Sequence, residues 1–168
     1  MLALLALTLA GTASPAVDRA EARWLPFFQA RPTEAAIVAA FGKPDLEDRT
    51  EDAERNLFFK RTPPFAGGLD AWVDPAGKVL DMTFYVAGVA RIWTRDAKLR
   101  AARLPSEINM ADVLARYGTP DHDKAGKGRR IGVRRLIYED FSSGATRSVT
   151  FSSLPFTGKV HAIAVSWE

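Results

Sequence analysis

The tetrapeptide Gly-x-Pro-Asp occurs twice in this chain of 168 residues, as Gly42-Lys43-Pro44-Asp45 and as Gly118-Thr119-Pro120-Asp121. An apolar stretch with helical periodicity precedes each copy, and segments typical of β-strands follow each copy. Glycine accepts the positive φ that often follows the last helical turn, and proline cannot continue a helix. The tetrapeptide therefore predicts two helix ends, and its recurrence indicates two copies of one α+β unit.

The two copies have similar predicted elements. Short helices are predicted over residues 33–41 and 109–117, with Thr33 and Asn109 as N-caps. Strands are predicted over residues 56–60, 69–73, 79–86, 133–138, 147–151 and 160–167. We predict an α+β fold of two tandem repeats, each a short helix or helical pair packed on a three- to four-stranded antiparallel sheet. The predicted repeats cover residues 17–95 and 96–168 and follow a signal peptide over residues 1–16.

The duplicated pattern resembles a known superfamily. The residues that carry the resemblance are Ile37 to Asp45, Asp112 to Asp121, Leu136-Ile137-Tyr138 and Gly158-Lys159-Val160. They resemble the SmpA/OmlA (BamE) family of small outer-membrane-assembly lipoproteins. The tandem arrangement is similar to the secreted β-lactamase inhibitory proteins (BLIP-like repeats). The resemblance implies a scaffold that binds through an open sheet surface.

The absence of cysteine separates this chain from both families. The lipoproteins carry a lipidated cysteine and the inhibitors carry disulfides, so we expect neither a lipid anchor nor a disulfide here. Inhibition of a β-lactamase is not carried over for the same reason.

The N-terminal residues have the pattern of a secretory signal. Leu2 to Ala10 is apolar apart from Thr8, and the small residues Ala13 and Ala16 follow it. The run is shorter than the about 20 residues that cross a bilayer, and no Lys or Arg precedes it. We expect an exported protein, periplasmic or secreted, with no transmembrane segment. The alternative is an apolar N-terminal helix docked on the core.

The sequence contains no recognisable catalytic set. We interpret Asp45 and Asp121 as turn residues that bond nearby backbone N–H groups, with a catalytic pair as the alternative. Asp121-His122-Asp123 is compact, and a weak metal site is the alternative to a solvated turn. His161 is interpreted as a half-buried sheet residue. We expect no enzyme, no cofactor and no metal, and keep a small hydrolase as a minor alternative.

Strand parity suggests where a partner binds. Residues 79–86 contain two alternating sets of side chains. The first set is Leu80, Met82, Phe84 and Val86, and the second set is Asp81, Thr83 and Tyr85. The first set is predicted to face helices and the second set an open surface, together with Trp72. We therefore predict a non-enzymatic binding module of the bacterial cell envelope, with Trp72, Asp81, Thr83 and Tyr85 as candidate contacts for another envelope or secreted protein. The alternative is that the second unit or residues 87–104 cover these side chains.

Basic residues are concentrated in one segment. Residues 91–135 contain twelve Lys and Arg against five Asp and Glu. A solvated loop and linker explains this excess, and an anionic partner is the functional alternative. Lys127, Arg129 and Arg130 are the candidate contacts, with anionic envelope lipid or polysaccharide as the ligand. Nucleic acid is not expected for an exported protein.

Overall fold

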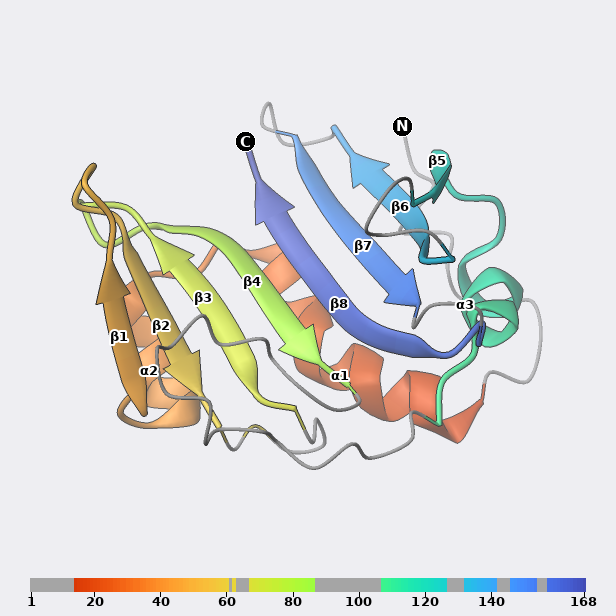
Figure 1. The fold of residues 1–168 in the computed structure, drawn as a ribbon, viewed down its shortest axis with the longest axis horizontal. Coiled ribbons are helices and arrows are strands. Elements are labelled where there is room, and N and C mark those ends of the chain that lie inside the picture. The colour runs from red at the N-terminus through yellow and green to blue at the C-terminus, as the bar shows by residue number, and fades with distance from the viewer. Residues whose placement is uncertain are drawn as a thin grey trace.

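The computed structural model describes residues 14–60, 62, 67–86, 107–126, 132–141, 146–153 and 157–168. The helices are α1 (Pro15–Gln29), α2 (Glu34–Phe41) and α3 (Met110–Tyr117). The strands are β1 (Leu46–Arg49), β2 (Arg55–Phe59), β3 (Leu69–Val73), β4 (Val79–Tyr85), β5 (His122–Ala125), β6 (Arg134–Asp140), β7 (Arg147–Ser153) and β8 (Val160–Trp167). Figure 1 shows their arrangement.

The strands form a single eight-stranded antiparallel sheet in the order β1-β2-β3-β4-β8-β7-β6-β5. Strands β4 and β8 pair at its centre, with Phe84 opposite Ile163 and Thr83 opposite Ala164. The prediction of two tandem repeats, each a helix on its own sheet, is therefore wrong. The physical reason is that an edge strand leaves backbone N–H and C=O groups unpaired, and β4 and β8 satisfy each other's.

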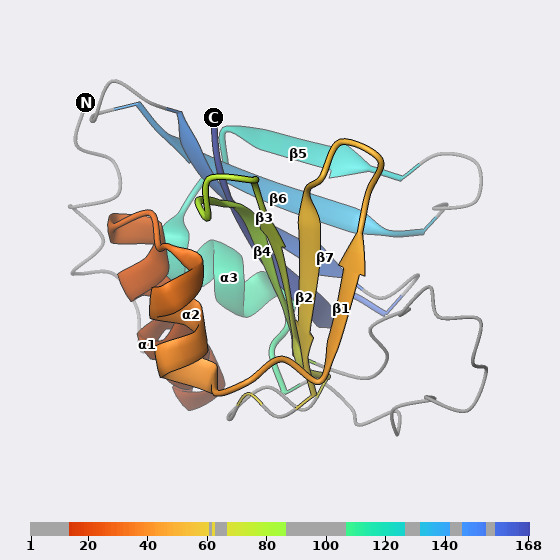
Figure 2. The same ribbon diagram turned by 90° about the vertical axis from the view of Figure 1, so that its left-hand side faces the viewer.

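Helix α1 also joins the two halves. The helices lie on one face of the sheet, as the two perpendicular views show (Figures 1 and 2). Trp24 of α1 makes edge contacts with Tyr117 and Phe151 from the second half. Phe27, three residues further along α1, contacts Phe41 and Phe84 from the first half. Both halves therefore share one core through this helix.

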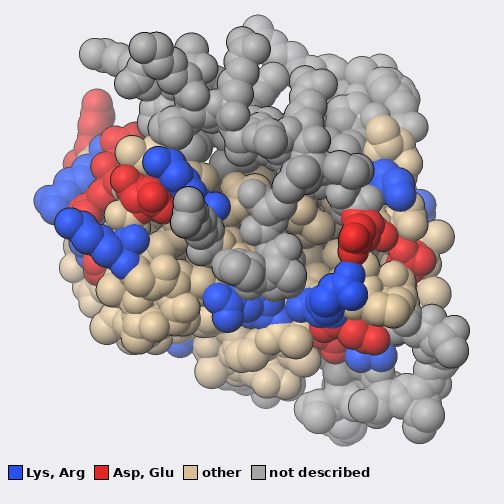
Figure 3. All heavy atoms as spheres, turned by 90° about the horizontal axis from the view of Figure 1, so that it is seen from below, with Lys and Arg blue, Asp and Glu red and all other residues tan. Residues whose placement is uncertain are grey.

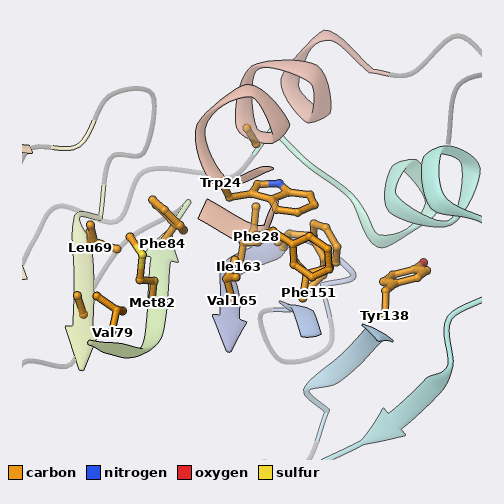
Figure 4. Close-up of a cluster of buried hydrophobic side chains, with 14 of the residues drawn as sticks. Trp24, Phe28, Leu69, Val79, Met82, Phe84, Tyr138, Phe151, Ile163 and Val165 are labelled. Carbon is orange, nitrogen blue, oxygen red and sulfur yellow. The ribbon is translucent and has the colours of Figure 1, made fainter. Parts of the chain in front are cut away.

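The core lies between the helices and the sheet. Figure 4 shows side chains of β3, β4, β7 and β8 gathered beneath α1. Trp24 is 1% exposed, and the sheet residues Met82, Phe84 and Ile163 are fully buried. Burial of this apolar surface is the main stabilising contribution to the fold.

Polar contacts hold α1 at both ends of its packed region. Glu21 accepts hydrogen bonds from Arg116 Nε at 2.9 Å and from the Tyr117 hydroxyl at 3.0 Å. Near the C-terminal end of α1, Arg147 Nη1 donates to the carbonyls of Phe28 and Gln29 at 3.1 and 2.7 Å. A cation here satisfies carbonyls that have no partner within the helix and interacts favourably with its dipole.

The two tetrapeptides end helices as their composition predicts. Gly42 and Gly118 have φ values of 84° and 74°. Asp45 and Asp121, however, bond residues distant in sequence rather than their own turns. Their Oδ2 atoms accept from the backbone N–H groups of Lys60 and Glu139, each at 2.8 Å. Each aspartate thus fixes the turn to the end of a neighbouring strand.

Two β-bulges change the predicted parity. Val73 is opposite Val79 and Trp72 is opposite Asp81, so Leu80 is an extra residue. Val79 is therefore the buried residue, and the expectation that Leu80 shares the apolar face with Met82 and Phe84 is wrong. His161 is the corresponding extra residue in β8, because Ser152 and Ser153 lie opposite Ala162 and Val160.

Several expectations concern residues outside the described ranges. These include residues 1–13 of the predicted signal and the predicted boundary between residues 95 and 96. Pro15 and Ala16 belong to α1, and Ala16 packs against the core. In the part of the chain that the structure describes, no helix is long and apolar enough to cross a membrane.

Candidate functional site

The candidate site lies on the face of the sheet opposite the helices. Side chains at every second position of a strand share a face, so the residues between the core positions point to this side. We call this the open face and define its centre by Asp70, Trp72, Asp81, Thr83, Tyr85, Ala164 and Ser166. The helices are on the other side of the sheet in Figure 2.

Strand register places the central residues in rows. Trp72 of β3 is opposite Asp81 of β4, which is opposite Ser166 of β8. In the next row, Asp70 is opposite Thr83, which is opposite Ala164. Asp70 and Asp81 are therefore diagonal neighbours on adjacent strands, about 7 to 8 Å apart at Cα. Pairing of β4 with β8 brings Ser166 to this cluster from 85 residues along the chain.

Hydroxyl groups fix both carboxylates. The Tyr85 hydroxyl donates to Asp70 Oδ2 at 2.8 Å. The Ser166 hydroxyl donates to Asp81 Oδ2 at 2.6 Å, and the Thr83 hydroxyl donates to Asp81 Oδ1 at 3.2 Å. The donors come from β4 and β8, so the sheet itself sets the orientation of both carboxylates.

The environment disfavours the charged form of both aspartates. Burial raises the pKa of the Asp70 carboxyl, and the nearby Asp81 charge raises it further, against the lowering effect of the Tyr85 hydrogen bond. Burial likewise raises the pKa of Asp81, against the hydrogen bonds from Ser166 and Thr83. Burial and the two carboxylates also raise the pKa of Tyr85, which stays a neutral donor.

No cation offsets these charges within the described ranges, where neither Asp70 nor Asp81 forms an ion pair. Other acidic side chains do have such partners, for example Asp123 with Arg134 at 2.6 Å. Asp70 and Asp81 thus differ from these acidic side chains, because the hydrogen bonds that their carboxylates accept come from hydroxyl groups.

The second half of the open face carries smaller polar side chains. Ser148, Thr150 and Ser152 alternate with the buried residues of β7. Further out, His122 of β5 lies 3.4 Å from Glu139 of β6, measured from Nε2 to Oε1. The strongest concentration of acidic and aromatic groups therefore lies on β3 and β4.

The structure places Trp72, Asp81, Thr83 and Tyr85 on one face, as parity indicates. Whether they bind a partner stays a prediction. Sequence reasoning missed Asp70 and Ser166. Alternation with Leu69 and Ala71 gives a local signal for Asp70. Ser166 has no such signal, because its place depends on the β4–β8 pairing.

The candidate basic residues Lys127, Arg129 and Arg130 lie outside the described ranges. Within them, Arg116 pairs with Glu21 at 2.9 Å and Arg134 pairs with Asp123. Figure 3 shows basic and acidic side chains interspersed on one side of the molecule. These two arginines of the basic segment are therefore largely neutralised by neighbours.

The compact Asp121-His122-Asp123 motif is divided among separate contacts. Asp121 accepts from the Glu139 N–H, His122 approaches the Glu139 carboxylate, and Asp123 pairs with Arg134. Among the described residues, no three His, Cys, Asp or Glu side chains are placed to hold one metal ion. Burial lowers the pKa of His161, against the raising effect of the backbone of Ser153 and Ser152, and its buried Nδ1 has no partner at hydrogen-bond geometry.

Comparison with known proteins gives few matches. The chain matches no protein-family model and no curated protein. One similar solved structure is an extracellular protein containing an SCP domain from Bacillus anthracis str. Ames, with 8% identity and a TM-score of 0.47, over 95% of this chain and 47% of that chain. Another is a cysteine-rich secretory protein from Staphylococcus aureus subsp. aureus Mu50, with 8% identity and a TM-score of 0.45, over 81% of this chain and 42% of that one.

These matches correct the expected family. Neither structure is an outer-membrane-assembly lipoprotein or a β-lactamase inhibitory protein, and no family model supports that resemblance. The expected membership of the SmpA/OmlA (BamE) or BLIP-like group is therefore wrong. The reason is that helix-ending Gly-x-Pro-Asp reports local geometry, which unrelated chains share. This chain spans less than half the length of either protein, and similarity at this level carries no argument about function.

Proposed function

We propose that this chain is an exported, non-enzymatic protein that binds another protein through the open face of its sheet. The observation that carries the proposal is the cluster of Trp72, Tyr85 and two carboxylates on the face opposite the helices. Half-buried aromatic side chains beside oriented polar groups are typical of protein interfaces. The alternative is binding of an anionic envelope lipid or polysaccharide through residues 91–135, whose candidate contacts Lys127, Arg129 and Arg130 lie outside the described ranges.

Site-specific photo-crosslinking tests the binding face. A photoreactive amino acid replaces Trp72 or Thr150 on the open face and, as matched controls, the exposed Ala22 of α1 or Ala39 of α2. In intact cells of the source organism, we expect the two open-face positions to capture the same protein and the two helix positions to capture none. Equal labelling from the helices, or none from the sheet, would contradict the proposal.

Salt separates the proposed interface from charge-driven binding by the basic segment. Capture through the half-buried open-face cluster is expected to change less with ionic strength than binding of an anionic lipid or polysaccharide by the basic segment, because half-buried charges are screened less than solvent-exposed ones. A steep loss of capture with salt that is the same in Asp70→Asn/Asp81→Asn would therefore favour residues 91–135 as the binding element.

Export is a separate part of the proposal. It rests on the apolar run from Leu2 to Ala10 and on the small residues that follow it. A phosphatase that is active only outside the cytosol, fused after Glu168, is expected to be active. Leu5→Arg within the apolar run is expected to abolish that activity, and an unchanged activity would argue against this signal.

A further inference from the structure

The Asp70–Asp81 pair has unused capacity to accept hydrogen bonds. A carboxylate offers about four acceptor sites. Asp70 accepts from Tyr85, and Asp81 accepts from Ser166 and Thr83. Both groups thus retain acceptor sites, while the existing hydroxyl contacts hold them in a defined orientation. A ligand that donates hydrogen bonds would meet preorganised acceptors.

The pair is also uncompensated in charge. Half-buried carboxylates lose part of their hydration, and a nearby cation recovers that loss. The described cations of the open face are either remote or already paired. Lys60 follows β2 two residues beyond Phe58, which is opposite Asp70, and its ammonium lies 3.9 Å from the Asp45 carboxylate. Arg135 and Lys124 lie on β6 and β5, beyond β8 and β7 from β4. With strands about 4.8 Å apart, Arg135 begins roughly 14 Å from β4.

Other titratable groups near the pair do not supply a positive charge. Tyr85 is a neutral donor, Glu139 lies three strands away on β6, and His122 faces Glu139. From β8 and β7 the facing side chains are Ala162, Ala164, Ser166, Ser148, Thr150 and Ser152, and from β2 they are Asn56 and Phe58. None of these residues carries a cation.

Trp72 adds an aromatic surface beside the carboxylates. It is directly opposite Asp81 in the β3–β4 register and is half-buried. A guanidinium or ammonium group gains energy over an indole ring, and a guanidinium also donates in a planar, forked geometry to carboxylates. The face therefore combines two anionic acceptors with an indole.

We infer that the open face binds a basic side chain of a partner protein, an arginine or lysine, seated against Asp70 and Asp81 with Trp72 alongside. This inference rests on the proposed function and specifies the chemistry of the partner. Charge complementarity favours this occupant, because the described cluster contains two carboxylates and an indole but no cationic donor. Arginine fits best, because its fork can contact more than one carboxylate oxygen.

A peptide titration tests this inference without knowledge of the partner. The probe is acetyl-Gly-Arg-Gly-amide, and the control is the same peptide with uncharged citrulline. The readouts are the carboxyl carbon shifts of Asp70 and Asp81 and the indole N–H of Trp72. We expect all three to follow one saturating curve, with binding of the citrulline peptide about ten-fold weaker or more, the size of one charge-assisted hydrogen bond.

Charge-matched variants separate specific recognition from attraction by net charge. Asp70→Asn/Asp81→Asn is expected to abolish the response at Trp72. Glu51→Gln/Asp52→Asn, in the exposed turn between β1 and β2, removes the same amount of charge. This control is expected to leave the response at Trp72 unchanged. Because the Asn variants remove unfavourable charge, they are expected to fold, and thermal unfolding checks this. Equal loss in both variants would overturn the inference.

Two further outcomes would also overturn it. One is that the arginine and citrulline peptides bind equally well, or that neither peptide binds. The other is tighter peptide binding after Arg91, Arg95 and Lys98 are changed to Gln, because the chain's own basic segment would then already occupy the pair. If photo-crosslinking at Trp72 succeeds while the arginine peptide fails, the proposed function stands and this inference fails. If the arginine peptide binds but photo-crosslinking fails, the open face recognises a cationic side chain, and the proposed binding of a partner protein is contradicted.

Discussion

On one side of β4, Met82 and Phe84 are fully buried beneath the helices, whereas on the other side Asp81, Thr83 and Tyr85 form a half-buried polar cluster. The same strand thus serves an apolar core and a polar surface. The core face gains free energy from apolar burial, while the open face holds carboxylates whose charged form is disfavoured by partial burial. Stability and binding can therefore be changed separately, and the following predictions test that division.

The largest expected difference is between the two tryptophans. Trp24→Ala removes the aromatic side chain that α1 packs against Tyr117 and Phe151, and we expect a loss of about 3 to 5 kcal/mol in the free energy of unfolding. Trp72→Ala on the open face is expected to cost about 1 kcal/mol. Urea denaturation measures both. Similar losses would mean that the open face contributes to the core.

Replacing Arg147 tests how α1 is held on the face of the sheet that carries the helices. Arg147→Leu leaves the partly buried Asp140 carboxylate without this partner and removes a donor to the last carbonyls of α1. We expect a loss of about 2 kcal/mol. The control is Arg49→Leu, which breaks an exposed pair with Glu47 and should cost less than about 0.5 kcal/mol. Equal effects would exclude a special role for Arg147.

The smallest expected changes in Tm come from replacing Asp81 and Asp123, and the two changes should have opposite signs. The pKa of Asp81 is raised in the folded protein, so its penalty develops as pH rises from the unfolded value toward the folded one and persists above it. Asp81→Asn should therefore raise the Tm at neutral pH and have no such effect below both pKa values. The lost acceptor site for Ser166 or Thr83 makes the gain small.

Asp123 supplies the contrast. A hydrogen bond from Arg134 lowers the pKa of its carboxyl, so its contribution to stability is present above the unfolded pKa and is lost as pH falls through the folded pKa. Asp123→Asn should therefore lower the Tm slightly at neutral pH, and the difference should vanish in acid. Thermal unfolding of both variants from about pH 3 to pH 7 measures the two signs. A change in Tm of the same sign for both variants would contradict the opposite pKa shifts assigned to Asp81 and Asp123.

Local sequence patterns correctly predicted those features that depend on interactions between residues close together in the chain. Gly42 and Gly118 end helices at positive φ because glycine avoids the steric cost, and the alternation in β4 placed Asp81, Thr83 and Tyr85 on one face. The edge strands β1 and β5 were missed because Leu-Glu-Asp-Arg and His-Asp-Lys-Ala have no apolar alternation. Charged edge strands are typical of sheets that avoid further pairing.

The pairing of strands far apart in the chain could not be predicted from these local patterns. Backbone hydrogen bonds form between strands of almost any sequence, so nothing local in β4 and β8 specifies that Thr83 lies opposite Ala164. That pairing converts two expected sheets into one and brings Ser166 to Asp81. The position of α1 across both halves also depends on packing that its own sequence does not encode.

The sequence by itself determined where the chain turns and which side chains alternate, because sterics at glycine and proline and the two-residue period of a strand act over a few residues. Only the tertiary structure decided that Asp70, Asp81, Tyr85 and Ser166 form one cluster. Their proximity results from strand register and from the need to satisfy unpaired edges, and both depend on residues far apart in the chain.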